Sequence, residues 1–173
     1  TDLSVSPIGF GCWAMGRTYW GDDVTDARST AAVHAALDAG ITLFDTAPLY
    51  GEGHADEVLV RALGSRKHDV VIATKVGVRL GPGHARSDLR PEHVVADTEE
   101  SLRRLGLEAI DLLQVHWPCE EGTPLQETVA ALAGLVDRGL VRHWGLCNYD
   151  SGSLRAAVGV STLQTPFNLL RRE

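Results

Sequence analysis

The stretch LFDTAPLY, residues 43–50, indicates both the fold and the site of this protein. Its apolar start is typical of a buried strand, the strand ends in an acid, Asp45, and Tyr50 follows within one short loop. In barrels of parallel strands, residues at the carboxyl ends of the strands form the site. We therefore expect Asp45 and Tyr50 to have a role beyond packing.

Two later apolar runs end in the same manner. The run VVIATK ends at Lys75, and LLQVH ends at His116. Because parallel strands deliver their end residues to one face, Asp45, Lys75 and His116 should converge there, with Tyr50 above them. Such a set is typical of a proton-transfer site.

The four side chains suit the reduction of a carbonyl group. Hydride addition leaves an alkoxide, which a phenol such as Tyr50 can protonate. A nearby Lys75 ammonium should lower the pKa of that phenol, and Asp45 should keep the ammonium charged. A neutral His116 can donate a hydrogen bond to the carbonyl oxygen.

Composition limits the class of protein. The chain has 173 residues, 44% of them hydrophobic, and a net charge of −7, and we expect residues 1–173 to form a single domain. The acidic balance argues against a nucleic-acid partner, and no apolar run is long enough to span a membrane. The thiols of Cys12, Cys119 and Cys147 match neither a zinc site nor a disulfide framework, which indicates no metal and a cytoplasmic location.

Strand and helix patterns alternate with a period of roughly thirty residues, as in βαβ units. Strands are expected at residues 5–13, 41–47, 69–75, 109–116, 140–147 and 161–166. Helices are expected between them, one capped by Thr25, one at residues 54–63, one beginning at Pro91, one with a capping box from Thr123 to Gln126, and a short one at 151–158. We expect residues 77–88 to form a flexible connection.

A (β/α)8 TIM barrel of the α/β class fits this alternation best. No G-x-G-x-x-G motif follows the first strand, which disfavours a dinucleotide-binding open sheet. Such barrels have about 250 residues, whereas the sixth predicted strand ends near the end of this sequence. We expect the sequence to hold about six of the eight β/α units, and this piece alone to bind a cofactor poorly.

Over nearly its whole length the chain resembles the aldo-keto reductases. The matching motifs are GFGCW, FDTAPLYG, ATKVG, SLRRLGLEAIDLLQVHWP, GLVRHWGLCNY and LQTPFNLLRRE. The resemblance implies an NADP-dependent oxidoreductase that reduces an aldehyde or ketone, with NADPH as cofactor and a small carbonyl compound as substrate. It also implies that Tyr50 is the general acid, that Lys75 and Asp45 tune it, and that His116 orients the substrate.

A cofactor site and a substrate pocket follow from the same resemblance and from the strand ends. The resemblance assigns Asn148 and Gln164 to the nicotinamide carboxamide, and Cys147 stands where the family usually has serine, a stronger hydrogen-bonding residue. We expect Cys12, Trp13 and Asp45 to lie near the cofactor as well. Three tryptophans at strand ends are candidates for the substrate pocket, although buried tryptophan is also common in cores: Trp13, Trp20 and Trp117.

Other functions stay open. Lys75 could form a Schiff base in a lyase, although a neighbouring Asp45 works against a nucleophilic lysine. A regulatory role is possible too, because the potassium-channel β subunits resemble reductases and retain the four residues. A metal hydrolase is less favoured, because it would need paired histidines where Cys12 and Trp13 stand.

Overall fold

The sheet at the centre of the molecule is parallel and curled. The structure, a computed structural model, describes residues 2–17, 20–21, 23–81 and 84–170. Within these residues six strands pair in the order β1-β2-β3-β6-β7-β8. They are β1 (Phe10–Gly11), β2 (Leu43–Asp45), β3 (Val71–Val76), β6 (Ile110–Val115), β7 (Val141–Cys147) and β8 (Thr162–Gln164).

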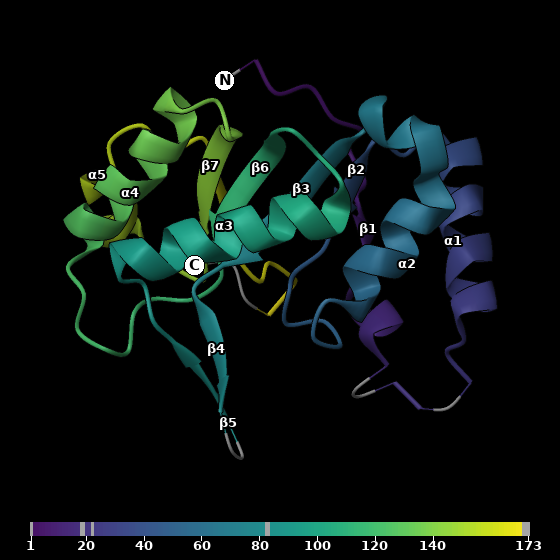
Figure 1. Ribbon diagram of the computed structural model, residues 1–173, viewed down its shortest axis with the longest axis horizontal. Helices are drawn as coiled ribbons and strands as arrows, with labels where there is room; N and C mark the ends of the chain where they lie inside the picture. The colour runs from purple at the N-terminus through teal and green to yellow at the C-terminus, as the bar shows by residue number, and fades with distance from the viewer. Residues whose placement is uncertain (1, 18–19, 22, 82–83, 171–173) are drawn as a thin grey trace.

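Helices alternate with these strands and cover the outer face of the sheet (Figure 1). They are α1 (Asp26–Asp38), α2 (His54–Leu63), α3 (Pro91–Leu105), α4 (Leu125–Asp137) and α5 (Ser151–Ala156), with 3-10 turns η1 (Trp13–Gly16) and η2 (Gly64–His68). The arrangement is that of an incomplete (β/α)8 barrel, as the sequence predicts. In the described part of the chain β1 and β8 are the outer strands, and they do not pair with each other. None of the described helices is both long and apolar enough to cross a membrane.

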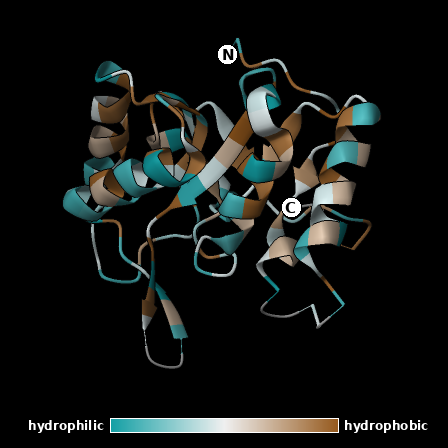
Figure 2. Ribbon diagram, turned by 45° about the vertical axis from the view of Figure 1, so that its right-hand side comes forward, coloured by the Kyte–Doolittle hydropathy of each residue, from teal (hydrophilic) through white to brown (hydrophobic). Residues whose placement is uncertain are grey.

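Two apolar clusters lie between the sheet and the helices. One joins the middle strands to α3 and α4, and the other joins β1 and β2 to α1 and α2. Successive side chains of a strand point to opposite faces, so Leu113 and Val115 of β6 enter the first cluster while Gln114 faces the barrel interior. Figure 2 shows the hydrophobic residues concentrated on the strands, with hydrophilic residues spread over the helices.

Local signals predict the helix ends well, with one exception. Thr25 caps α1, where its side chain accepts a hydrogen bond from the Arg28 amide, and Pro91 is the first residue of α3. The predicted capping box at Thr123 is wrong. The residue before α4 is Pro124, and no side-chain hydrogen bond caps the helix there.

The prediction of a flexible connection at residues 77–88 is also wrong. Strand β4 (Val78–Gly81) and strand β5 (His84–Ser87) form an antiparallel hairpin in which Val78 pairs with Ser87 and Leu80 with Ala85. The hairpin projects from the sheet between β3 and α3 (Figure 1). Alternating side chains within residues 78–81 and 84–87 explain this pairing, and residues 82 and 83 lie outside the described part of the chain.

Candidate active site

The ends of three adjacent strands bring the predicted acid, lysine and histidine together. Asp45 is the last residue of β2, Lys75 lies near the end of β3, and His116 directly follows β6. The strands are staggered, because Asp45 pairs with Ala73 and Lys75 pairs with Gln114. Each functional side chain therefore lies two residues further along its strand than the preceding one, as in a barrel with tilted strands.

Lys75 is a buried ammonium with two acceptors. Its Nζ atom donates to Oδ1 of Asp45 at 2.6 Å and to the Thr46 carbonyl oxygen at 3.0 Å. Burial alone would lower the pKa of Lys75, but the negative charge of Asp45 and the interaction with Tyr50 outweigh burial and raise it. Lys75 is therefore a fixed positive charge at neutral pH.

Tyr50 lies above this charge on the loop between β2 and α2. Its ring centroid is 5.5 Å from Nζ of Lys75. The backbone of the loop touches the backbone of η1, since a Cβ atom added at Gly16 would lie 2.6 Å from the amide nitrogen of Gly51. Gly51 also has φ +64°, so both positions favour glycine, and this close contact fixes where Tyr50 stands.

The pKa of Tyr50 differs from the sequence-based expectation. We expected Lys75 to lower it, and the lysine does favour the phenolate, but burial of the ring is the larger effect and the net pKa is raised. The phenol is therefore fully protonated at neutral pH.

His116 is a neutral imidazole in this structure. Burial and the charge of Lys75 lower its pKa from 6.5 to about 3. Its ring stacks on Trp117 at a centroid distance of 4.4 Å and meets the Tyr50 ring edge-on at 6.1 Å. A neutral ring keeps one N–H donor, which suits hydrogen bonding to a carbonyl oxygen.

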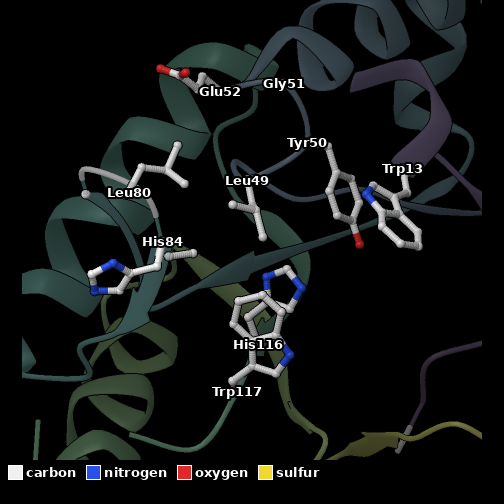
Figure 3. Close-up of a pocket in the computed structure, with 11 residues that line it drawn as sticks. Trp13, Leu49, Tyr50, Gly51, Glu52, Leu80, His84, His116 and Trp117 are labelled. Carbon is white, nitrogen blue, oxygen red and sulfur yellow. The ribbon is translucent and has the colours of Figure 1, made fainter. Parts of the chain in front are cut away.

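A cavity of about 510 Å³, here called the tryptophan cavity, opens above these residues. Trp13, Tyr50, His116 and Trp117 line it, and Figure 3 shows the Tyr50 ring beside Trp13 with the hydroxyl group pointing toward the side of His116. Trp20 does not line the cavity; it packs edge-on against Trp13 at a centroid distance of 5.6 Å. The structure thus brings two of the three candidate tryptophans to the cavity.

A further wall of the tryptophan cavity was not predicted from the sequence. That wall comes from the β4–β5 hairpin and from the loop around Tyr50. Its residues are Leu49, Gly51, Glu52, Leu80, Gly81, His84 and Ala85. The alternating pattern of the hairpin was the signal that could have indicated this wall.

A second cavity of about 290 Å³, here called the amide cavity, adjoins the first on the side of β7 and β8. Tyr50, Lys75 and His116 line it together with Cys147, Asn148, Gln164, Thr165 and Pro166. The side chains of Asn148 and Gln164 are exposed, and Nε2 of Gln164 donates to Oδ2 of Asp45 at 3.2 Å. Thr165 and Pro166 were not singled out from the sequence.

The remaining candidates lie at different depths. Cys147 is buried, its Sγ donates to Oε1 of Gln164 at 3.1 Å, and burial raises the pKa of the thiol to about 12. Cys12 is fully buried in the core beside α2, and burial raises the pKa of its thiol further. Trp13 lines the tryptophan cavity rather than the amide cavity. Within the described residues, no group of three or more His, Cys, Asp or Glu side chains is placed to hold a metal ion.

An incomplete α/β barrel that gathers a tyrosine, a lysine, an aspartate and a histidine at one end of its strands is typical of an enzyme. Comparison with known proteins identifies the family. The model of the aldo/keto reductase family matches residues 7–173. The chain belongs to the aldo/keto reductase family.

Several curated relatives match nearly the whole chain. The Aldo-keto reductase YhdN of Bacillus subtilis is 37% identical over 100% of this chain and 53% of its own length. The probable voltage-gated potassium channel subunit beta of Arabidopsis thaliana is 32% identical over 92% of this chain and 48% of its own length. The NADH-specific methylglyoxal reductase of Escherichia coli is 31% identical over 99% of this chain and 58% of its own length. The chain thus spans about half the length of these relatives.

Solved structures agree with the fold. The glycerol dehydrogenase AKR11B4 from Gluconobacter oxydans superposes with a TM-score of 0.88 at 37% identity, covering 99% of this chain and 54% of that one. An aldo-keto reductase from Klebsiella pneumoniae in complex with NADPH gives a TM-score of 0.79 at 31% identity, covering 96% of this chain and 56% of that one.

Proposed function

We propose that the protein reduces an aldehyde or ketone to an alcohol with NADPH, and that Tyr50 donates the proton. The observation that carries the proposal is that Tyr50 and His116 line both cavities, above the Lys75–Asp45 pair. A carbonyl group at the junction of the two cavities would meet the phenol and the imidazole together.

The residues of the amide cavity fit a nicotinamide. Asn148 and Gln164 are exposed side-chain amides on adjacent strand ends, and each can exchange hydrogen bonds with a carboxamide. When bound, NADPH supplies the hydride that reduces the carbonyl carbon. The choice of NADPH follows the family resemblance and the NADPH complex of the Klebsiella pneumoniae reductase, whereas the Escherichia coli relative is named as NADH-specific.

The protein's own groups then manage the proton. The raised pKa of Tyr50 keeps the proton on the phenol oxygen until charge develops on the substrate oxygen. The charge of Lys75 stabilises the phenolate that remains after transfer, and Asp45 keeps that charge in place. Neutral His116 aligns the carbonyl oxygen through one N–H group.

The composition of the tryptophan cavity favours a carbonyl compound with an apolar part. Its walls include two indole rings and the side chains of Leu49 and Leu80. Apolar walls reward burial of apolar area, while the polar groups at the junction fix the orientation of the substrate.

A Schiff-base lyase is disfavoured by the same geometry. A nucleophilic lysine needs a lowered pKa, but Asp45 holds the pKa of Lys75 above its ordinary value. The match to a potassium channel subunit beta keeps a regulatory role as the second candidate, in which the four residues would remain and turnover would be slow.

Turnover decides between these functions. A panel of aldehydes and ketones with NADPH or NADH should show cofactor oxidation, fastest with apolar aldehydes. Borohydride treatment in the presence of substrate should leave Lys75 unmodified. A trapped adduct on Lys75 would support the lyase, and a protein that binds NADPH but oxidises none with any carbonyl would support the regulatory role.

A further inference from the structure

A line of contacts leads from Lys75 away from both cavities into the layer between α2 and α3. Nζ of Lys75 donates to the Thr46 carbonyl oxygen at 3.0 Å, and the Thr46 hydroxyl donates to Oδ1 of Asp56 at 2.6 Å. Nη1 of Arg104 then donates to Oδ2 of Asp56 at 3.2 Å. Both Thr46 and Asp56 are 0% exposed. Among the described residues that line the tryptophan and amide cavities, neither Asp56 nor Arg104 occurs.

Burying the charged carboxylate of Asp56 costs free energy. Burial raises the pKa of its carboxyl group, and hydrogen bonds from Thr46 and Arg104 oppose that rise. A buried ion pair seldom stabilises a fold more than apolar side chains of the same size would. A fully buried carboxylate therefore calls for a role other than general stability.

The positive charge of Lys75 reaches Asp56. It lowers the pKa of Asp56, so the two groups interact electrostatically as well as through Thr46. Lys75 and Arg104 also line one further cavity, of about 190 Å³, beneath the Tyr50 loop. The titratable groups that interact with Lys75 on all sides are Asp45 on β2, Tyr50 on the following loop, His116 after β6, Cys147 on β7, Cys12 after β1 and Asp56 on α2.

Arg104 also fixes the segment between Tyr50 and α2. Its guanidinium lies across Gly53, since a Cβ atom there would lie 2.5 Å from Nε of Arg104. Gly53 precedes α2 with φ +92°, which again favours glycine. One side chain of α3 therefore holds both the start of α2 and the carboxylate of Asp56.

We propose that Asp56 and Arg104 act through Thr46 as a positioning pair that holds the Lys75 ammonium beneath Tyr50. Thr46 directly follows Asp45, the last residue of β2. The two acceptors of the Lys75 ammonium, the Asp45 carboxylate and the Thr46 carbonyl oxygen, therefore come from consecutive residues. The pair touches neither substrate nor cofactor. The expected effect of the pair on turnover rests on the proposed function, whereas its expected effect on the pKa of Tyr50 does not.

The matched variants Thr46→Val and Thr46→Ser test the pair. Valine keeps the shape of threonine but removes the hydroxyl group that reaches Asp56, whereas serine keeps the hydroxyl group. Ultraviolet difference titration of the cofactor-free protein, with Tyr50→Phe as the blank, gives the pKa of Tyr50. We expect a higher pKa in Thr46→Val than in the wild type, because Lys75 is less well placed to favour the phenolate, and a value close to the wild type in Thr46→Ser.

Turnover supplies a second measurement. In Thr46→Val kcat should fall about tenfold with KM within about twofold, since a buried carboxylate loses one donor and the lysine shifts. Arg104→Met should behave in the same manner. The control is Glu99→Gln, which removes an exposed ion pair with Arg138 from the same helix and should leave both measurements unchanged.

An unchanged Tyr50 pKa in a folded Thr46→Val protein would overturn the proposal. Thermal unfolding of each variant establishes that it is folded, and the Thr46 variants decide the matter even if Arg104→Met does not fold. Because the titration needs neither cofactor nor substrate, it stands even if the wild type reduces no carbonyl compound. Failure of the positioning pair and failure of the proposed function are thus separate outcomes.

Discussion

Nζ of Lys75 lies 2.6 Å from Oδ1 of Asp45, and the lysine side chain is 3% exposed while the aspartate side chain is 21% exposed. The ammonium is therefore almost completely withdrawn from water, and its charge depends on one partly solvated carboxylate. Removal of that carboxylate would leave an uncompensated buried charge, which is much costlier than the loss of a surface pair.

Asp45→Asn should lower the free energy of unfolding by about 3 kcal/mol at neutral pH for this reason. The folded pKa of Lys75 is raised above 10.5, so its stabilisation is present below the unfolded pKa and is lost as the pH rises through the folded pKa. The difference between wild type and variant should therefore shrink at strongly alkaline pH. Urea unfolding at a series of pH values measures it, with Glu99→Gln as an exposed-pair control.

Lys75→Met tests whether the two residues act as a unit. It should raise the pKa of Tyr50, because the cation that favours the phenolate is gone. The double variant with Asp45→Asn should be less unstable than the sum of the two single variants, since neither then leaves a charge unpaired. Additive losses would mean that the pair is not coupled.

His116 should make stability depend on pH in the acid range. Its folded pKa of about 3 lies below the ordinary value of 6.5, so the unfolded chain takes up a proton that the folded chain does not. Stability should fall as the pH drops from 6.5 toward 3, by about a factor of ten in the unfolding constant per pH unit.

The variant His116→Gln isolates this contribution. Its unfolding constant should depend on pH with a slope smaller by one proton over that range, because the other histidines contribute equally to both proteins. Urea unfolding between about pH 4 and pH 7 compares the two slopes. Equal slopes would show that His116 titrates in the folded protein as it does in the unfolded chain.

The hairpin should control the affinity for apolar substrates. Leu80 is 52% exposed and lines the tryptophan cavity, so Leu80→Ala should change stability little and raise KM for a bulky apolar aldehyde about tenfold. The value of kcat with a small aldehyde should stay within a few-fold. Val158→Ala, at an equally apolar and more exposed position outside the cavity, is the control. A similar rise in KM in both variants would contradict a role of the hairpin in binding the substrate.

The sequence predicts the parts of this structure that depend on local patterns. Apolar runs locate the six strands, because strands buried on both faces are nearly continuous apolar runs. A glycine at the carboxyl end, Gly64, helps to locate helix α2. The prediction of a capping box at Thr123 was wrong because Pro124, not Thr123, precedes α4, which begins one residue later than expected. The prediction of a flexible connection at residues 77–88 was wrong because the glycines of the hairpin resemble those of a mobile loop.

The geometry of the site depends on tertiary structure. The convergence of Asp45, Lys75 and His116 can be predicted from their positions at strand ends. The net pKa of Tyr50 cannot, because it depends on how deeply neighbouring elements bury the ring. The contacts of Asp56 with Thr46 and Arg104 join residues up to 48 positions apart, and no local pattern indicates them.

The turnover of Tyr50→Phe tests the central claim, that the strand ends form a carbonyl-reducing site, most directly. The change deletes one hydroxyl group from a loop, so NADPH affinity and thermal stability should stay close to those of the wild type. We expect kcat for a simple aldehyde to fall by about 10² or more, with Tyr149→Phe, which alters another partly buried phenol, as the matched control. Turnover of Tyr50→Phe within a few-fold of the wild type would contradict the assignment of the proton donor and, with it, the site.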